Sequence, residues 1–306
     1  MSQTMQFENN FREAIVSTIA FFDLFDYPLT PYEIYKYSED DLSLSEIISF
    51  LEQEIDQADA LIRQKNGFYF LIGREEITAT RQKRHNYTRR KIKIARRFCR
   101  LLKICPFVSL VAVANLIGDN NLRDQSDIDF FIITAPRRLW LARLYCAGLA
   151  KILNLRPTAK NKKDKICLSF YVSADHLNLN DLRLSGADPY FDYWRRGLIL
   201  LYDKEGIYVQ FLEKNGLSKK SDSAPRPIKK KSSHTSVLIS FFFNFLERLA
   251  KKIQLKIMPA ALNAAVNNSD GVVVSDTVLK LYLRDHRREY AEKYGNKINE
   301  ILKKND

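Results

Sequence analysis

The sequence has few cysteines, no long apolar run and no secretory leader. Its four cysteines, Cys99, Cys105, Cys146 and Cys167, form no C-x-x-C pair and no metal-ligand spacing, so neither a zinc ribbon nor a disulfide scaffold is expected. No uninterrupted apolar run reaches the roughly 18 residues that a membrane span needs, and the N-terminus does not read as a signal peptide. We therefore expect reduced thiols, a cytoplasmic location and no integral membrane segment.

Acidic residues are outnumbered by basic ones, and histidine is scarce. The 306 residues include 36 Asp or Glu, 49 Lys or Arg and four His, which gives a formal net charge of +13. This balance favours polyanionic partners. His176 has no predicted partner, and a lone histidine is more typical of structure than of catalysis. The 46% of hydrophobic residues suffice for a core, and the length is typical of two domains.

The most informative stretch lies between residues 108 and 134. It contains two apolar runs, Val108–Ala114 and Phe130–Ile133, whose shortness and β-branched or aromatic content predict buried strands. The polar segment between these runs ends in Ser126-Asp127-Ile128-Asp129. Because alternate side chains of an extended strand share one face, Asp127 and Asp129 are expected to lie side by side.

Two neighbouring carboxylates at the edge of a dry interior repel each other unless a cation lies between them. Magnesium suits such a pair, because it binds a few carboxylate oxygens and keeps positions open for water and substrate phosphates. The alternative is structural, with one aspartate capping a turn and the other in solvent. We take Asp127 and Asp129 as the candidate metal ligands and catalytic residues.

The order of strand, turn, short helix and S-D-I-D at a second strand resembles the nucleotidyltransferase superfamily related to DNA polymerase beta. In that family a Gly-Ser pair follows the first strand, about ten residues before the aspartates. The corresponding residues here are Asn115 and Leu116. Asn115 can offer its amide to phosphate, whereas Leu116 offers only its backbone N–H. The resemblance implies an NTP held by Asn115, Leu116 and Ser126, with Mg²⁺ on Asp127 and Asp129.

The family also places a third carboxylate on a later strand. The strand expected here, Ile166–Val172, carries Ser169 at its middle and no acid. Asp164 before it and Asp175 after it are the remaining candidates for a third ligand or a general base. Two functions stay open. One is transfer of a nucleoside monophosphate from an NTP to a hydroxyl acceptor, and the other is a catalytically degenerate adaptor that binds nucleotide or nucleic acid on the same fold.

Three short sequence motifs extend the resemblance along the chain. Similar motifs occur in a group of bacterial proteins: A-N-L before S-D-I-D, R-L-W after the second strand, and K-I-C-L-S-F. Those proteins join a small helical N-terminal module to a nucleotidyltransferase-like domain. The similarity covers Phe11 to about Glu213 and implies the fold more than the activity.

Residues 9–78 are expected to form a separate N-terminal domain. Apolar residues recur at helical spacing from Phe11 to Phe22. Thr30-Pro31 and Ser43 predict the starts of two further helices, and Asn66-Gly67 predicts a hairpin turn. Three helices and a hairpin resemble a winged helix. Because the third helix is acidic, we favour protein contacts or packing over DNA binding.

Residues 79–104 are expected to form one long connecting helix with a basic outer face. The segment from 78 to 103 holds eleven Lys or Arg and no acid. Such a face either binds nucleic acid or nucleotide phosphates through helix 81–103, or is simply solvated. The cations that could make such contacts are Arg81, Lys83, Arg84, Arg89, Arg90, Lys93, Arg96, Arg97 and Arg100.

Residues 105–214 are expected to form the nucleotidyltransferase-like domain. Helices are predicted over Arg137–Leu153 and Tyr190–Tyr202. Arg137, Arg138 and Arg143 are candidates for contact with a triphosphate, with a helix surface as the plainer role.

Residues 215–234 are predicted to be a flexible linker, and residues 235–306 a helical region. Segment 237–257 predicts an amphipathic helix that either lies on an anionic membrane surface or packs on the preceding domain, and we favour packing. Ser275–Lys304 predicts a final helix. The predicted fold class is therefore α/β (α+β), with a small mixed sheet flanked by helices, an N-terminal winged-helix-like domain and C-terminal helices.

Overall fold

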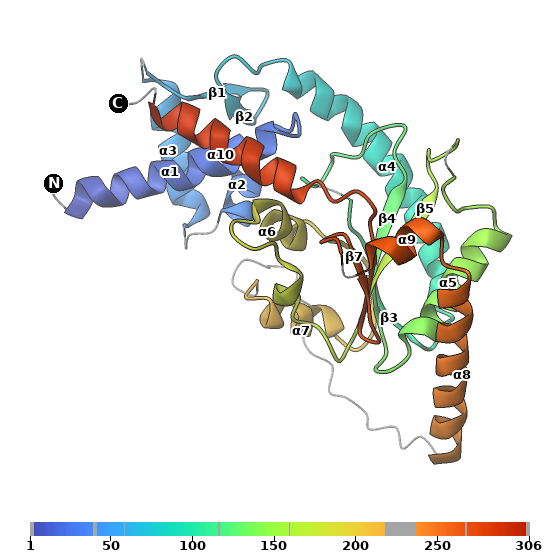
Figure 1. Cartoon of the computed structure of the whole chain (residues 1–306). Coiled ribbons are helices and arrows are strands. Elements are labelled where there is room, and N and C mark those ends of the chain that lie inside the picture. The colour runs from blue at the N-terminus through green and yellow to red at the C-terminus, as the bar shows by residue number, and fades with distance from the viewer. Residues whose placement is uncertain are drawn as a thin grey trace.

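A mixed sheet of six strands forms the centre of the molecule (Figure 1). The computed structural model describes residues 3–38, 42–57, 59–115, 117–158, 160–217, 237–266 and 268–303. The strands are β3 (Val108–Val113), β4 (Ile128–Thr134), β5 (Ile166–Ser173), β6 (Ile199–Asp203), β7 (Val272–Val274) and β8 (Val278–Leu281). Their order is β6-β3-β4-β5-β8-β7. Only β4 and β5 run parallel among these neighbours, which confirms a mixed sheet flanked by helices.

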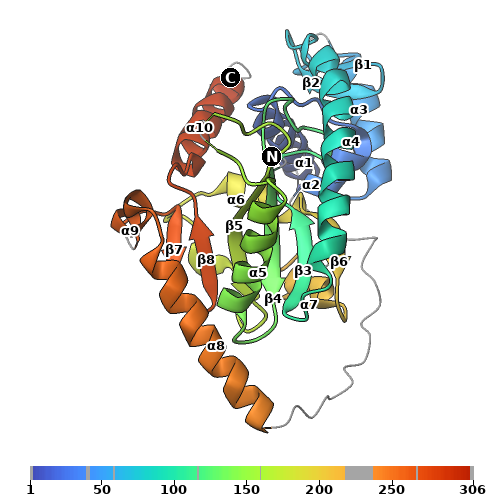
Figure 2. The same cartoon turned by 90° about the vertical axis from the view of Figure 1, so that its right-hand side faces the viewer.

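The alternation of side chains along β4 divides the core into two layers. Phe130 and Ile132 pack toward α4 (Ile77–Leu102) and α5 (Leu139–Ile152), which face the viewer in Figure 2. Phe131 and Ile133 pack on the opposite face, toward α6 (Pro189–Arg196) and α7 (Ile207–Lys214). Helix α5 connects β4 to β5, as a parallel pair requires a crossover.

The N-terminal part consists of three helices and a hairpin, as the sequence predicts. The helices are α1 (Gln3–Asp23), α2 (Pro31–Tyr37) and α3 (Leu44–Ile55), and the hairpin pairs β1 (Ile62–Lys65) with β2 (Phe68–Leu71). Thr30 and Ser43 each begin a helix with a complete capping box. Asn66 and Gly67 both have positive φ, which the tight turn between the strands requires.

Helix α4 is continuous as predicted, but several of its cations are opposed by partners from other elements. Arg81 is buried and pairs with Glu33, and Arg84 donates to the Phe25 carbonyl and to Asn121. Arg90 pairs with Asp124 and Asp164. Arg81 and Arg84 are therefore not the outward-facing charges that were predicted, whereas Arg90 is partly exposed and engaged by two carboxylates. The cations of this helix that remain exposed are Lys83, Arg89, Lys93, Arg96, Arg97 and Arg100.

Two segments that were expected to be helical contain strands. The helix predicted over Tyr190–Tyr202 ends at Arg196, and β6 follows it and pairs with β3. The final helix predicted from Ser275 begins only at Arg287, as α10 (Arg287–Lys303), because β8 precedes it and pairs with β5. Short apolar runs do not distinguish a strand from a helix by periodicity alone, and here the pairing partner decides.

Helix α10 returns across the N-terminal helices (Figure 1). Lys297 forms an ion pair with Asp23 of α1, and Tyr290 and Tyr294 contact Phe25 and Phe21 at ring centroid distances of 4.8 and 5.6 Å. The C-terminal part thus adds β7 and β8 to the sheet, and α10 then connects the sheet to the N-terminal helices.

The remaining elements surround the sheet. They are the short η1 (Asn180–Leu182), α8 (Val237–Lys256), which packs against α5, and α9 (Ala260–Ala265). The predicted linker lies outside the described residues from position 218 onward. Among the helices described, none combines the length and the apolar character that crossing a membrane requires.

Candidate functional site

The two predicted aspartates lie side by side at the start of β4. Asp127 immediately precedes the strand, and Asp129 is its second residue. Ile128 between them is fully buried on the side of α4 and α5, so both carboxylates point to the opposite side of the sheet. One ligand oxygen from each aspartate and the sulfur of Cys167 all lie within 4.8 Å of one another. The two carboxylates thus share one face, as the alternation of the strand predicts.

Burial makes the two carboxylates difficult to ionise together. Burial, and after it the charge of Asp127, raise the pKa of Asp129 to about 7, although Cys167 and Lys162 oppose the shift. Burial likewise raises the pKa of Asp127. A cation between them would offset this repulsion, so the pair has the electrostatic character of a metal site.

Cys167 completes the cluster with the two aspartates. It pairs with Asp129 in the parallel register of β4 and β5, and its thiol hydrogen-bonds the Asp129 carboxylate. Burial and the charge of Asp129 raise the pKa of Cys167 well above its usual value, so the thiol stays protonated and acts as a donor. Its sulfur lies 3.0 Å from the Ser169 hydroxyl. No acid joins the two aspartates in this cluster among the described residues.

Asn115 connects the end of β3 to the aspartate strand. Its side-chain amide donates to the backbone carbonyl of Asp127 at 2.9 Å, while its own carbonyl oxygen is buried and has no partner among the described residues. The adjacent Ala114 carbonyl accepts a hydrogen bond of 2.7 Å from the Trp194 indole. Asn115 therefore positions Asp127 and also presents an unpaired acceptor beside the site, whereas Leu116 lies outside the described residues.

A buried lysine of α4 anchors the loop before β4. Lys91 has a fully buried side chain, and its ammonium group donates to the Ser126 carbonyl and, at 2.8 Å, to Asp164. Arg90 forms a second ion pair with Asp164. Asp164 is thus engaged with α4 and is not part of the acidic cluster. The Ser126 hydroxyl donates to the Arg123 carbonyl, so it stabilises its own turn.

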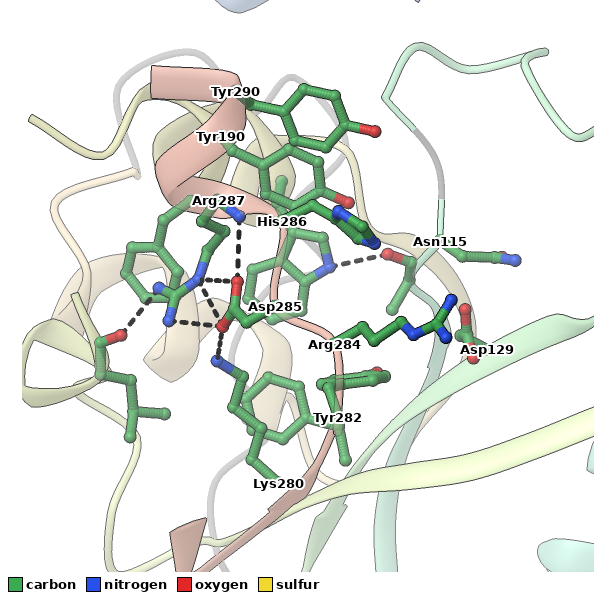
Figure 3. Close-up of a pocket in the computed structure, with 15 residues that line it drawn as sticks. Asn115, Asp129, Tyr190, Lys280, Tyr282, Arg284, Asp285, His286, Arg287 and Tyr290 are labelled. Carbon is green, nitrogen blue, oxygen red and sulfur yellow. Dashed lines mark hydrogen bonds and ion pairs between the residues drawn. The ribbon is translucent and has the colours of Figure 1, made fainter. Parts of the chain in front are cut away.

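A pocket of about 250 Å³ opens beside Asp129 (Figure 3). Its walls come from segments far apart in the chain: the end of β3, strand β5, helix α6 and the segment from β8 to α10. The lining side chains are aromatic or charged in most positions: Asn115, Asp129, Phe170, Tyr190, Phe191, Trp194, Lys280, Tyr282, Arg284, Asp285, His286, Arg287 and Tyr290. The pocket therefore combines acidic, cationic and aromatic groups around one cavity.

An ion-pair network holds the C-terminal wall of this pocket. Asp285 lies 2.9 Å from the Lys280 ammonium and 2.9 Å from the Arg287 guanidinium, and Arg287 also pairs with Asp188 at 2.8 Å. Burial opposes ionisation of Asp285, but these two cations lower its pKa. The network fixes the chain between β8 and α10. Arg284 extends from this segment, and its guanidinium points toward Asp129 in Figure 3.

His286 is the functional candidate that sequence reasoning missed. It lines the pocket, and its Nδ1 lies 2.9 Å from the Glu289 carboxylate one turn along α10. A carboxylate that accepts from Nδ1 leaves Nε2 with its lone pair, which is the arrangement of a general base. The sequence did contain a signal for a functional loop here, because a run of charged residues, Arg284-Asp285-His286-Arg287, lies between an apolar segment and a helix.

Several predicted residues lie away from the acidic pair. Asp175 follows β5 at its other end, and Arg137 and Arg138 follow β4 at the end opposite Asp129. Arg138 donates to Asn244, and Arg143 to Gln254. The structure therefore directs Arg138 and Arg143 toward α8, so the suggestion that they meet a triphosphate at the aspartates is wrong.

No protein-family model matches this chain, and comparisons with curated proteins and with solved structures found no match.

Proposed function

We propose that this chain is a magnesium-dependent nucleotidyltransferase, which moves a nucleoside monophosphate from an NTP to a hydroxyl acceptor. The observation that carries the proposal is the pair Asp127 and Asp129, held together beside a pocket of about 250 Å³. Two carboxylates that resist simultaneous ionisation fit a hard divalent cation, which takes carboxylate oxygens and keeps positions for water and phosphate. When bound, Mg²⁺ would supply neutralisation of the phosphate charge.

The lining of the pocket suits the other parts of a nucleotide. Arg284 offers a guanidinium for phosphate oxygens on the side of Asp129 (Figure 3). The partly exposed rings of Tyr190, Tyr282 and Tyr290 line the pocket and offer aromatic surface against which a base can pack. Charged groups on one side and aromatic groups on the other match a ligand with a polyphosphate end and a planar end.

The transfer requires a base, and His286 has that role in our proposal. The acceptor hydroxyl attacks the α-phosphorus, an oxygen–phosphorus bond forms, and the bond to the leaving pyrophosphate breaks. The hydroxyl proton passes to Nε2 of His286, whose Nδ1 is oriented by Glu289. Asp164 does not serve as the base, because Lys91 and Arg90 engage it.

The second candidate function is nucleotide binding without transfer. The observation that favours it is Cys167, a protonated thiol in register with Asp129 on β5, the strand that carries no acid. A thiol is a poor ligand for a hard cation. In this case the pocket would bind a nucleotide without transferring any group from it. The nucleotide-bound protein would then act as an adaptor for another molecule.

The experiment is a transfer assay with purified full-length protein, Mg²⁺, each of the four NTPs labelled at the α-phosphate, and a cell extract as the source of acceptors. Binding of each NTP is measured in parallel by equilibrium dialysis, with and without Mg²⁺. The test variant is Asp127→Asn/Asp129→Asn. Asp203→Asn is the matched control, since Asp203 is another partly buried aspartate of the same sheet and lies on β6.

We expect label transfer by the wild type and by Asp203→Asn, and none by the double variant. Magnesium-dependent NTP binding without transfer by the wild type would select the second candidate. Transfer that persists in the double variant, or the absence of any Mg²⁺-dependent NTP binding, would refute both.

A further inference from the structure

Helix α8 exposes a row of large apolar side chains that no described residue covers. Phe241, Phe242 and Phe245 are 76%, 57% and 60% exposed, and Ile257, directly after the helix, is 71% exposed. Leu249 and Ile253, at 43% and 44%, complete the row. With about 200 Å² for a fully exposed phenylalanine, the row presents on the order of 600 Å² of apolar surface. This is at the upper end of what a monomer exposes in one patch.

The opposite side of α8 is already used for packing. Glu247 accepts hydrogen bonds from the backbone N–H groups of Trp140 and Leu141 at 2.7 and 3.0 Å, at the start of α5. Ala250 is 2% exposed, and Gln254 donates to the Trp140 carbonyl at 2.8 Å. The predicted packing of this helix is thus present, but it occupies only one face. The phenylalanine row lies on the other face.

The exposed face of α8 is also basic. Arg248, Lys252 and Lys256 are exposed and form no ion pair with any described residue. Between residues 237 and 257 the only acidic residue is Glu247, which faces α5. The outward face therefore carries aromatic groups in its first half and Lys252 and Lys256 in its second half. Arg248 lies at the edge of this face, where it lines a pocket with Asp175, Glu247 and Asp276.

We propose that α8 is a docking surface for a bilayer containing anionic lipids. The helix would lie in the plane of the interface, with its phenylalanines between the headgroups and the acyl chains and its lysines against lipid phosphates. A second copy of the chain fits less well, because two such faces would bring cations together without any acid.

The placement of α8 is compatible with this role. Its first half projects beyond the body of the molecule in both views (Figures 1 and 2). It packs near the end of β4 that is opposite Asp129, so a bound membrane would leave the pocket accessible. Membrane binding by α8 would not depend on the proposed transfer reaction.

The test is co-sedimentation of the full-length protein with vesicles of phosphatidylcholine alone or mixed with phosphatidylserine, at low and high salt. Phe241→Ser/Phe245→Ser removes two aromatic anchors, and Lys252→Glu/Lys256→Glu reverses two charges. Arg96→Glu/Arg100→Glu on α4 is the matched control for charge, since both arginines are exposed and far along another helix. Ile257→Ser is compared with Ile152→Ser, because these side chains are 71% and 81% exposed.

We expect the wild type to bind vesicles that contain phosphatidylserine. Each α8 double variant should bind these vesicles at least about tenfold more weakly. The α4 control and Ile152→Ser should bind as the wild type does. In Phe241→Trp the emission of the new indole should shift to shorter wavelength on addition of vesicles.

Three results would overturn the proposal. The first is a wild type that fails to sediment with phosphatidylserine vesicles. The second is binding of the phenylalanine and Ile257 variants to these vesicles as tight as that of the wild type. Alternatively, light scattering could show a dimer that Phe241→Ser/Phe245→Ser dissociates, without any vesicle binding, which would assign the face to a second copy.

Discussion

Replacing Asp129 with asparagine should stabilise the metal-free protein and abolish its Mg²⁺ binding. Burial, and after it the charge of Asp127, raises the pKa of Asp129 from 3.8 to about 7. A shift of that size corresponds to on the order of 4 kcal/mol of unfavourable free energy when the group is ionised. Asparagine keeps the shape of the side chain and removes its charge. The variant should therefore be more stable to unfolding than the metal-free wild type by about 2 kcal/mol near pH 8.

The sign follows from proton binding. Between about pH 4 and pH 7 the folded protein holds a proton on Asp129 that the unfolded chain has lost, so this group makes stability fall as the pH rises through that window. In Asp129→Asn this contribution is absent. Added Mg²⁺ should stabilise the wild type by mass action and leave the variant unchanged.

The assay is urea unfolding followed by tryptophan fluorescence, at about pH 5 and about pH 8, with and without Mg²⁺. Asp285→Asn is the control with the opposite sign, because Lys280 and Arg287 stabilise the Asp285 carboxylate and its neutral replacement should destabilise the fold near neutral pH. A lower stability of Asp129→Asn than of the wild type at the higher pH without metal would contradict the predicted charge burial. Equal stabilisation of both proteins by Mg²⁺ would contradict metal binding at Asp129.

Three further predictions concern single residues around the site. Lys91→Met should lower the free energy of unfolding by about 2–3 kcal/mol and weaken Mg²⁺ binding, because it leaves the Ser126 carbonyl without its donor; an unchanged urea midpoint would contradict this. His286→Gln should slow transfer about 100-fold or more with little change in NTP affinity, measured by single-turnover kinetics. Arg284→Ala should weaken NTP binding about tenfold in equilibrium dialysis, whereas Arg288→Ala, which lies outside this pocket, should not; equal effects would count against the phosphate contact.

Local patterns were sufficient for much of the fold. The capping boxes at Thr30 and Ser43 and the turn at Asn66-Gly67 were readable because each depends on residues within a few positions of one another. The central strands β3, β4 and β5 were readable because their apolar runs are short and bounded by polar segments. The shared face of Asp127 and Asp129 follows from the same two-residue period.

Strands β6 and β8 were missed for different reasons. Strand β6 is short, and it is a strand because it pairs with β3. Strand β8 forms a hairpin with β7, so the valine run Val272–Val274 before Ser275-Asp276 was a local signal for strands. The pairing of β8 with β5, in contrast, depends on a distant segment. The same dependence hid the pocket. Arg284 and His286 reach it only because β8 pairs with β5 and delivers the following segment beside Asp129.

The sequence by itself determined the local elements and the pairing of two aspartates on one face, since these depend on backbone geometry over a few residues. Tertiary structure alone decided that Cys167 stands opposite Asp129, that Lys91 is buried against the loop before β4, and that one face of α8 stays exposed. The physical reason is that strand register, ion pairing and burial depend on which distant segments meet. No local pattern carries that information.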